Sequence, residues 1–192
     1  KNVASQYPDQ VSKMQAFYDQ WWAELEPTFA ETTELHVGHK DHPVVSLTSH
    51  DWIGGPTPWN QGHNRSKYPL KKGKSAKHEG HWALKVLKTG TYQIEVMRWP
   101  AESGKGINEE LVAGAEVPGE SKAFRAQIGQ RIGATAATLR LNGENLETKP
   151  VNSGAKKVVF ETKLTKGKHK LSPIFRVPEG ELGCYYAVIK TK

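Results

Sequence analysis

The chain has 192 residues, of which 36% are hydrophobic and 24% charged, and its formal net charge is +7. This length suits one domain with a small appendage, and the composition excludes an intrinsically disordered chain. No apolar run approaches the roughly 20 residues that span a bilayer, which argues against a membrane partner. The basic charge favours anionic partners, namely nucleic acid, acidic lipid or sulfated sugars.

Residues 8–26 are predicted to form a helix. Pro8 suits the first helical position, and Pro27 ends the helix. Apolar residues recur at three- and four-residue steps and form one stripe: Val11, Met14, Phe17, Tyr18, Trp21, Trp22 and Leu25. We expect this stripe to pack against the rest of the chain, or to be a face that covers a partner outside this sequence.

After the helix, short alternating runs predict strands. Residues 44–48 form the first, and a long irregular stretch with a basic run at 71–77 follows over 51–80. Residues 82–87 and 92–96 flank a turn at Gly90, which predicts a hairpin, and 158–164 with 169–174 repeat this design around Gly167. Further strands are predicted at 124–128, at 138–141 before the hairpin signal Asn142-Gly143, and at 185–189.

About eight or nine strands with a single helix predict a mostly β protein. We expect an antiparallel β-sandwich of the jelly-roll type, similar to carbohydrate-binding modules, with one N-terminal amphipathic α-helix. The predicted parts are a helical segment at 1–30 and a β-sandwich accessory domain at 31–192.

The sequence contains no recognisable catalytic motif. Cys184, the only cysteine, lies in an apolar run that predicts a buried, inert thiol. His36, His39 and His42 are three residues apart, but Gly38 and Pro43 argue against the helix that would bring their side chains together. We therefore expect no metal site and no cofactor in this chain.

Several aromatic residues stand outside the alternating positions, namely Trp52, Trp59, Tyr68 and Trp99. Sugars stack on such rings while neighbouring polar groups bind their hydroxyls. The predicted ligand-binding residues are Trp52, Trp59, Trp99, Arg98 and His50. The alternative is that the tryptophans close the ends of the core. A nucleic-acid partner is disfavoured because the lysines are not interleaved with aromatic residues.

Several motifs resemble the C-terminal region of bacterial arylsulfatases. They are FYDQWW at 17–22, VSLTSHDW at 45–52, WNQ at 59–61, GHW at 80–82, GTY at 90–92 and MRWPAE at 97–102. The resemblance runs over most of the chain and is densest over residues 14–102.

The resemblance implies a parent enzyme that hydrolyses sulfate esters in the periplasm or outside the cell. That family uses a formylglycine made from Cys or Ser in a C-x-P-x-R or S-x-P-x-R motif, beside a calcium ion. Neither motif occurs here, and Cys184 is followed by Tyr185. The resemblance therefore implies a non-catalytic accessory domain, with calcium in the parent's catalytic domain and that domain as its partner. We expect it to bind carbohydrate or sulfated glycan; the alternative is a purely structural domain that packs on the catalytic domain or mediates assembly.

Overall fold

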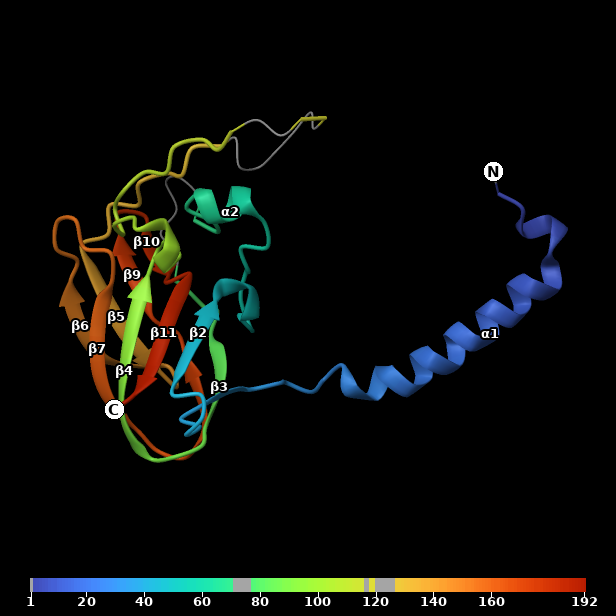
Figure 1. The fold of residues 1–192 in the computed structure, drawn as a ribbon, viewed down its shortest axis with the longest axis horizontal. Helices are drawn as coiled ribbons and strands as arrows, with labels where there is room; N and C mark the ends of the chain where they lie inside the picture. Colours follow the sequence, from blue (N-terminus) through green and yellow to red (C-terminus); the bar gives the residue numbers. More distant parts are fainter. Residues whose placement is uncertain (1, 71–76, 116–117, 120–126) are drawn as a thin grey trace. The chain divides into compact units, whose positions relative to one another are not determined.

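The computed structural model describes residues 2–70, 77–115, 118–119 and 127–192. The chain divides into two compact units, Lys1–Thr33 and Glu34–Lys192 (Figure 1). No helix among the described residues is long and apolar enough to cross a membrane. The predicted basic run at 71–77 lies outside the described residues except for Lys77.

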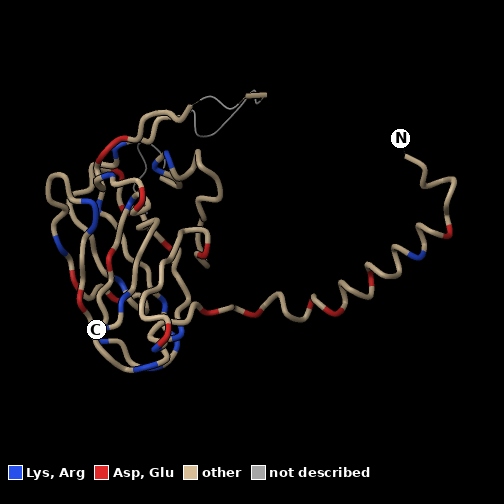
Figure 2. The backbone as a smooth tube through the Cα atoms, in the orientation of Figure 1, with Lys and Arg blue, Asp and Glu red and all other residues tan. Residues whose placement is uncertain are grey.

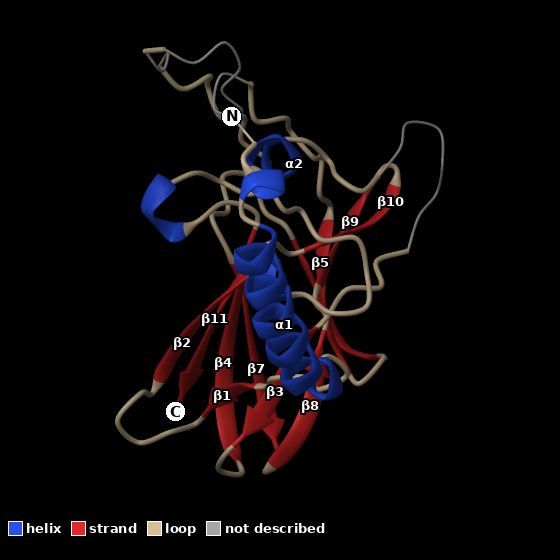
Figure 3. Cartoon of the chain, turned by 90° about the vertical axis from the view of Figure 1, so that its right-hand side faces the viewer, coloured by secondary structure: helices blue, strands red, loops and turns tan. Residues whose placement is uncertain are grey.

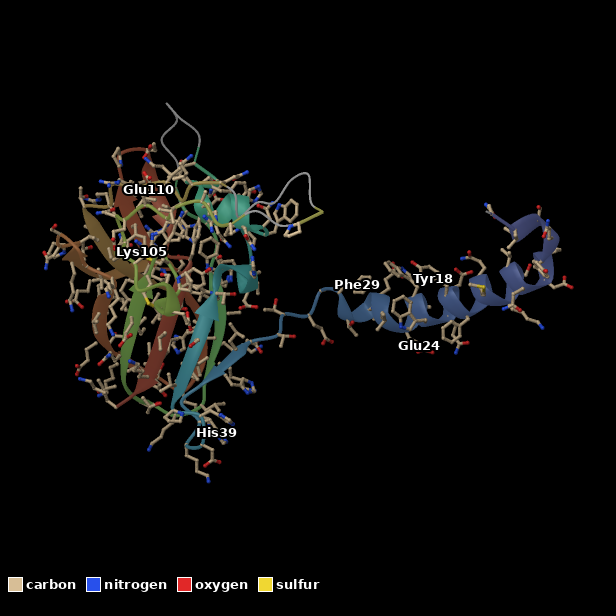
Figure 4. The ribbon with its side chains drawn as sticks, turned by 45° about the horizontal axis from the view of Figure 1, so that its top comes forward. Tyr18, Glu24, Phe29, His39, Lys105 and Glu110 are labelled. Atoms are coloured by element: carbon tan, nitrogen blue, oxygen red, sulfur yellow. The ribbon has the colours of Figure 1, made fainter. Side chains whose placement is uncertain are left out.

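The first unit is built on one helix, α1 (Pro8–Leu25), between two short 3-10 turns, η1 (Ala4–Gln6) and η2 (Glu26–Thr28). Pro8 stands at the start of α1, as predicted, and α1 has no buried residue. Tyr18 and Phe29 project from this unit (Figure 4), and the side chain of Phe17 is 74% exposed. The predicted apolar stripe is therefore present, and its large side chains are exposed.

The second unit is a two-layer β-sandwich (Figures 1 and 3), which confirms the predicted fold. The smaller sheet has the order β2-β11-β4-β7, with strands Val44–Thr48, Tyr186–Thr191, Gly90–Met97 and Val158–Leu164. The larger sheet has the order β1-β3-β8-β5-β9-β10, with strands Leu35–Val37, Trp82–Val86, Gly167–Leu171, Ala136–Leu141, Ile174–Val177 and Gly180–Gly183. Strand β6 (Glu144–Pro150) pairs with β5, and three short helical segments lie outside the sheets: η3 (Ser49–Asp51), α2 (Gln61–Arg65) and η4 (Ala101–Ser103).

Both predicted hairpins around Gly90 and Gly167 are wrong in their pairing. Strand β3 lies in the larger sheet and β4 in the smaller one, and β8 and β7 are divided in the same way. Instead, β3 pairs with β8 and β4 with β7, both antiparallel. The two connections lie side by side, because the backbone N–H of Lys166 donates to Thr89 Oγ1 over 2.8 Å. The alternating residues therefore face each other across the sandwich instead of sharing one sheet.

The hairpin predicted at Asn142-Gly143 is confirmed. It joins β5 to β6, and both turn residues have positive φ, 52° for Asn142 and 87° for Gly143. This is the backbone of a type I′ turn, which Asn and Gly adopt readily. The predicted strand at 124–128 falls outside the described residues at 124–126, and Gln127 and Ile128 belong to no strand.

The core lies between the two sheets. Trp82 and Leu84 from β3 face Ile94 and Val96 from β4, and all four side chains are fully buried. Cys184 is also buried, as predicted, and this burial raises the pKa of its thiol well above the usual value. A thiol that stays protonated and shielded in this way is not a nucleophile.

Candidate functional site

One exposed tryptophan of the second unit lies just before a short helix at an end of the sandwich. In Figures 1 and 3 this helix, α2, lies at the same end of the sandwich as β9 and β10. Asn60 is the N-cap of α2, and its side-chain Oδ1 accepts from the backbone N–H of His63 over 2.9 Å. Trp59 immediately precedes this cap and is 68% exposed. The cap therefore fixes where the chain leaves Trp59 on the surface.

Beneath Trp59, two more rings complete what we call the aromatic platform, defined by Trp59, His63 and Tyr68. The indole of Trp59 meets the imidazole of His63 nearly edge-on, with ring centroids 5.4 Å apart and an interplanar angle of 85°. The platform is anchored to the core because the hydroxyl of Tyr185 donates to the carbonyl oxygen of Tyr68. Burial raises the pKa of Tyr185 to about 12, so this phenol remains a donor at neutral pH.

A second anchor is the side chain of Arg98, which is fully buried. Its guanidinium carbon lies 4.1 Å from the ring centroid of Trp99 and 4.4 Å from that of Tyr185. Its Nη2 donates to the carbonyl oxygen of Ser66 over 2.6 Å, whereas Nε and Nη1 have no partner among the described residues. Burial lowers the pKa of Arg98 to about 10, which leaves it charged at neutral pH. The cation–π contacts with these two rings stabilise the charge, since no carboxylate of the described residues pairs with it.

Ion pairs and hydrogen bonds tie the rest of the α2 segment to neighbouring loops. Lys67 Nζ lies 2.6 Å from Glu179 Oε1 in the turn before β10. Arg65 Nη1 donates to the carbonyl oxygens of Val112, over 3.1 Å, and Gln127, over 2.7 Å. The guanidinium of Arg65 is therefore already hydrogen-bonded to two backbone carbonyl oxygens of this chain. On this segment the exposed amide of Gln61 remains available for a ligand beside Trp59.

The structure separates the five predicted ligand-binding residues into two groups. Trp59 and His50 are exposed, on α2's N-terminal flank and on η3 respectively. Trp52, Trp99 and Arg98 are buried, with 7%, 3% and 0% of their surface exposed. Sugar stacking requires an open ring face, which among these tryptophans only Trp59 presents.

The two buried tryptophans close the core, as the alternative interpretation expected. Trp52 packs edge-on against Trp82, with centroids 5.8 Å apart, and against Tyr185 at 5.7 Å. Trp99 donates from Nε1 to the carbonyl oxygen of Glu109 over 3.0 Å. Trp52 and Arg98 therefore both contact the ring of Tyr185. Through the hydrogen bond from Tyr185 to Tyr68, they support the segment that presents Trp59.

Sequence reasoning left His63 and Tyr185 out of the site. His63 had a local signal, because it is the third residue after the capping Asn60, where the cap binds its N–H. Tyr185 had none, since it lies 117 residues from Tyr68, whose carbonyl it binds. The spaced histidines do not form a cluster: the rings of His39 and His42 are 5.8 Å apart across a turn. Within the described residues, no group of three or more His, Cys, Asp or Glu side chains is placed to hold a metal ion.

Comparison of the sequence with family models and with curated proteins found no match. Among solved structures, the chain is similar to a ruminal GH26 endo-β-1,4-mannanase, with a TM-score of 0.40 and 16% identity, over 81% of this chain and 27% of that one. The chain thus spans about a quarter of the mannanase. A family 35 carbohydrate binding module from an environmental isolate is similar over 77% of this chain and 97% of its own, with a TM-score of 0.41 and 11% identity. A family 35 module from Clostridium thermocellum is similar over 78% and 98%, with a TM-score of 0.37 and 11% identity. These are distant similarities, and none supports a sulfatase parent.

Proposed function

We propose that residues 34–192 form a non-catalytic module that binds glycan on the aromatic platform. The observation behind this proposal is the 68% exposure of Trp59 above a supported pair of rings. A large aromatic side chain that is exposed on a rigid support is typical of a binding surface, because little entropy is lost when a ligand covers it. The apolar face of a pyranose ring would stack on the indole, and Gln61 would bind its hydroxyls.

The charge of this unit favours an anionic glycan. Residues 1–33 hold two of the 27 Lys and Arg and five of the 20 Asp and Glu, so residues 34–192 have a formal net charge of +10. Figure 2 shows mainly acidic residues along α1 and both basic and acidic residues over the second unit, where the basic residues are in excess. Such a field raises the local concentration of a polyanion such as a sulfated polysaccharide.

The test is affinity electrophoresis of the full chain through gels that contain a sulfated polysaccharide or its neutral counterpart. We expect retention at low salt, and we expect Trp59→Ala to weaken it by about tenfold, equivalent to roughly 1.4 kcal/mol. Trp21→Ala is the matched control, because Trp21 is also an exposed tryptophan, at 46%, but lies on α1. The proposal would be refuted if the chain is not retained, or if the Trp59→Ala variant is retained as strongly as the parent chain.

A second candidate function rests on the exposed stripe of α1. Nine large apolar side chains on or near this helix are at least 40% exposed, which favours a structural role in docking or assembly: Val3, Tyr7, Val11, Met14, Phe17, Tyr18, Trp21, Trp22 and Phe29. Under this alternative, Trp21→Ala would change the association state measured by analytical ultracentrifugation, and Trp59→Ala would not.

The wider assignment, an accessory domain of a periplasmic or secreted sulfatase-like hydrolase with calcium in its catalytic domain, remains a proposal from the sequence motifs. Its support is the set of motifs between residues 17 and 102. The open reading frame upstream of Lys1 tests it directly. A C-x-P-x-R or S-x-P-x-R motif there would support the sulfatase parent, and a different catalytic motif would exclude it.

A further inference from the structure

A pocket that shares no lining residue with the aromatic platform lies on the outer face of the larger sheet. Its volume is about 340 Å³, and it is lined by Gly54, His78, Glu79, His81, Gly143, Lys170 and Ser172. Lys170 and Ser172 flank Leu171, which is fully buried in the core. Because side chains alternate along a strand, those of Lys170 and Ser172 lie on the opposite, solvent-facing side of the sheet. We call this hollow the β8 pocket.

The β8 pocket lies where the end of β8 meets the turn that follows β5. Strands β5 and β8 share one register pair, Leu141 with Leu171, before the chain turns at Asn142. Asn142 closes this turn against β8: its backbone N–H donates to the carbonyl oxygen of Lys170 over 2.8 Å, and its Oδ1 accepts from the Lys170 N–H over 2.8 Å. The turn therefore forms a fixed wall of the pocket, and it places Lys170 at the rim.

Two glycines line the pocket. A Cβ atom at Gly143 would meet no other atom within 4 Å, so this position borders open space. Gly54 is held next to His81 by two backbone hydrogen bonds between Ile53 and His81, of 2.9 and 3.0 Å. A Cβ at Gly54 would lie 3.4 Å from the imidazole of His81 and would narrow the pocket there.

The charged groups of the pocket are one cation and one anion that do not neutralise each other. Neither Lys170 nor Glu79 forms an ion pair within 4.0 Å among the residues that the structure describes. The other acid and base nearby are paired with each other, since Arg140 Nη2 lies 2.9 Å from Glu181 Oε1. Burial lowers the pKa of His78 to about 4, and burial and Lys170 lower that of His81, so both imidazoles are neutral at pH 7.

This pattern of charges selects a class of ligand. The Glu79 carboxylate would repel an anion in this pocket, and the Lys170 ammonium would repel a cation. A neutral polyhydroxylated ligand satisfies both, because a hydroxyl accepts from an ammonium and donates to a carboxylate. Neutral imidazoles and the hydroxyl of Ser172 add further donors and acceptors. The volume of about 340 Å³ is at the lower end of the range for ligand sites and suits a single sugar ring.

We propose that the β8 pocket binds one neutral sugar unit, whose hydroxyls bridge the Lys170 ammonium and the Glu79 carboxylate. This site is distinct from the aromatic platform, with which it shares no lining residue, and it does not depend on the function proposed for Trp59. A pocket of this size accommodates a single sugar ring, such as the end of a glycan chain. The exposed indole of Trp59 can instead stack on a sugar ring within a longer chain. The two sites would therefore recognise different parts of a glycan.

The test is a titration of the full-length chain, followed by its backbone amide spectrum, with the methyl glycosides of glucose, galactose, mannose and xylose as probes. We expect at least one glycoside to shift the amides of Gly54, Glu79, Gly143 and Ser172 in a saturable way. Lys170→Met and Glu79→Gln should each weaken that affinity by about tenfold, the effect of losing one charged hydrogen bond. Both residues are exposed, so the variants should keep the dispersed spectrum of the folded chain.

Lys166→Met is the matched control, since Lys166 is also exposed and lies in the connection between β7 and β8, outside the pocket. It should bind the glycoside as the parent chain does. Trp59→Ala should also leave these shifts unchanged, which separates this site from the platform. The proposal is overturned if none of the four glycosides gives saturable shifts, if the shifts ignore both pocket variants, or if a charged glycoside such as methyl glucuronide binds there and the neutral ones do not.

Discussion

The imidazole of His63 lies parallel to the phenol ring of Tyr68, with ring centroids 3.8 Å apart and an interplanar angle of 3°. This stack connects the exposed indole of Trp59 to Tyr68, and the backbone carbonyl oxygen of Tyr68 accepts a hydrogen bond from the core residue Tyr185. The orientation of the exposed ring is therefore set by contacts that reach the interior of the sandwich.

We predict that His63→Ala weakens retention on a sulfated polysaccharide by several-fold while changing the free energy of unfolding by about 1 kcal/mol or less. Aromatic stacking contributes about 0.5–1.5 kcal/mol beyond area burial, and this stack lies near the surface. Affinity electrophoresis and urea denaturation would measure the two effects. His36→Ala, at an exposed histidine of β1, is the control. Equal retention of both variants would show that the stack does not support binding.

Arg98→Met is expected to loosen the α2 segment more than it destabilises the sandwich. The variant loses the hydrogen bond to Ser66 O and the cation–π contacts with Trp99 and Tyr185, but it also removes a buried guanidinium with two nitrogens that have no partner among the described residues. These effects oppose each other, so we expect the free energy of unfolding to change by about 1 kcal/mol or less. Hydrogen exchange at the amides of Ser66 and Leu70 should accelerate by about tenfold or more. Unchanged exchange at these amides would contradict the anchoring role; Arg176→Met, at an exposed position of β9, should have no such effect.

Gly183→Ala should destabilise the chain by about 2 kcal/mol or more, because overpacking a rigid core displaces its side chains. A Cβ atom at Gly183 would lie 2.4 Å from the ring of Trp52 and 2.5 Å from that of His78. Neither ring has room to move, since both are buried. Gly90→Ala is the control, because a Cβ there would meet its nearest atom, in Tyr92, at an ordinary 3.9 Å. Thermal and urea denaturation of both variants would check the difference.

Acid should destabilise the fold through His78. Burial, with a smaller effect from Arg140, lowers the pKa of His78 from 6.5 to about 4. Below pH 6.5 the imidazole of His78 binds a proton in the unfolded chain but not in the folded one. The contribution of this group to the free energy of unfolding is therefore fully present above pH 6.5 and is lost as the pH falls to about 4. The loss attributable to this group is about 2–3 kcal/mol. It would appear in urea denaturation across that range, and an NMR titration should find one imidazole that titrates near pH 4.

No decline in stability between pH 6.5 and pH 4, or a His78 resonance that titrates near its usual pKa, would contradict this assignment. His50→Gln serves as the control, since His50 is exposed and this variant should keep the decline in stability that His78 causes.

Local patterns in the sequence were sufficient for much of the fold. Period-two alternation predicted strands at 82–87 and 92–96, and their alternating residues Trp82, Leu84, Ile94 and Val96 lie in the core. It did not reveal that β3 and β4 belong to different sheets, because alternation specifies which face of a strand is buried and not which strand pairs with it. The Asn142-Gly143 turn succeeded where the Gly90 turn failed, since its φ requirement selects a tight hairpin by itself.

The candidate site shows the same division. Trp59 was predicted because it stands outside the alternating positions beside polar residues, and the structure exposes it. Trp52, Trp99 and Arg98 were predicted with it from equally polar surroundings, but the ends of the sandwich cover them. Exposure depends on which distant segments fold over a side chain, and the sequence around it does not contain that information.

By itself, then, the sequence determined the helix predicted at 8–26, which the structure forms over Pro8–Leu25, the β class of the remainder and the turn at Asn142, all of which depend on propensities of neighbouring residues. Only the tertiary structure decided that Tyr185 supports Tyr68 across 117 residues, and that Glu79 and Lys170 border one pocket. Backbone propensity acts over a few residues, whereas packing and electrostatics act through space between segments that only the finished sandwich brings together.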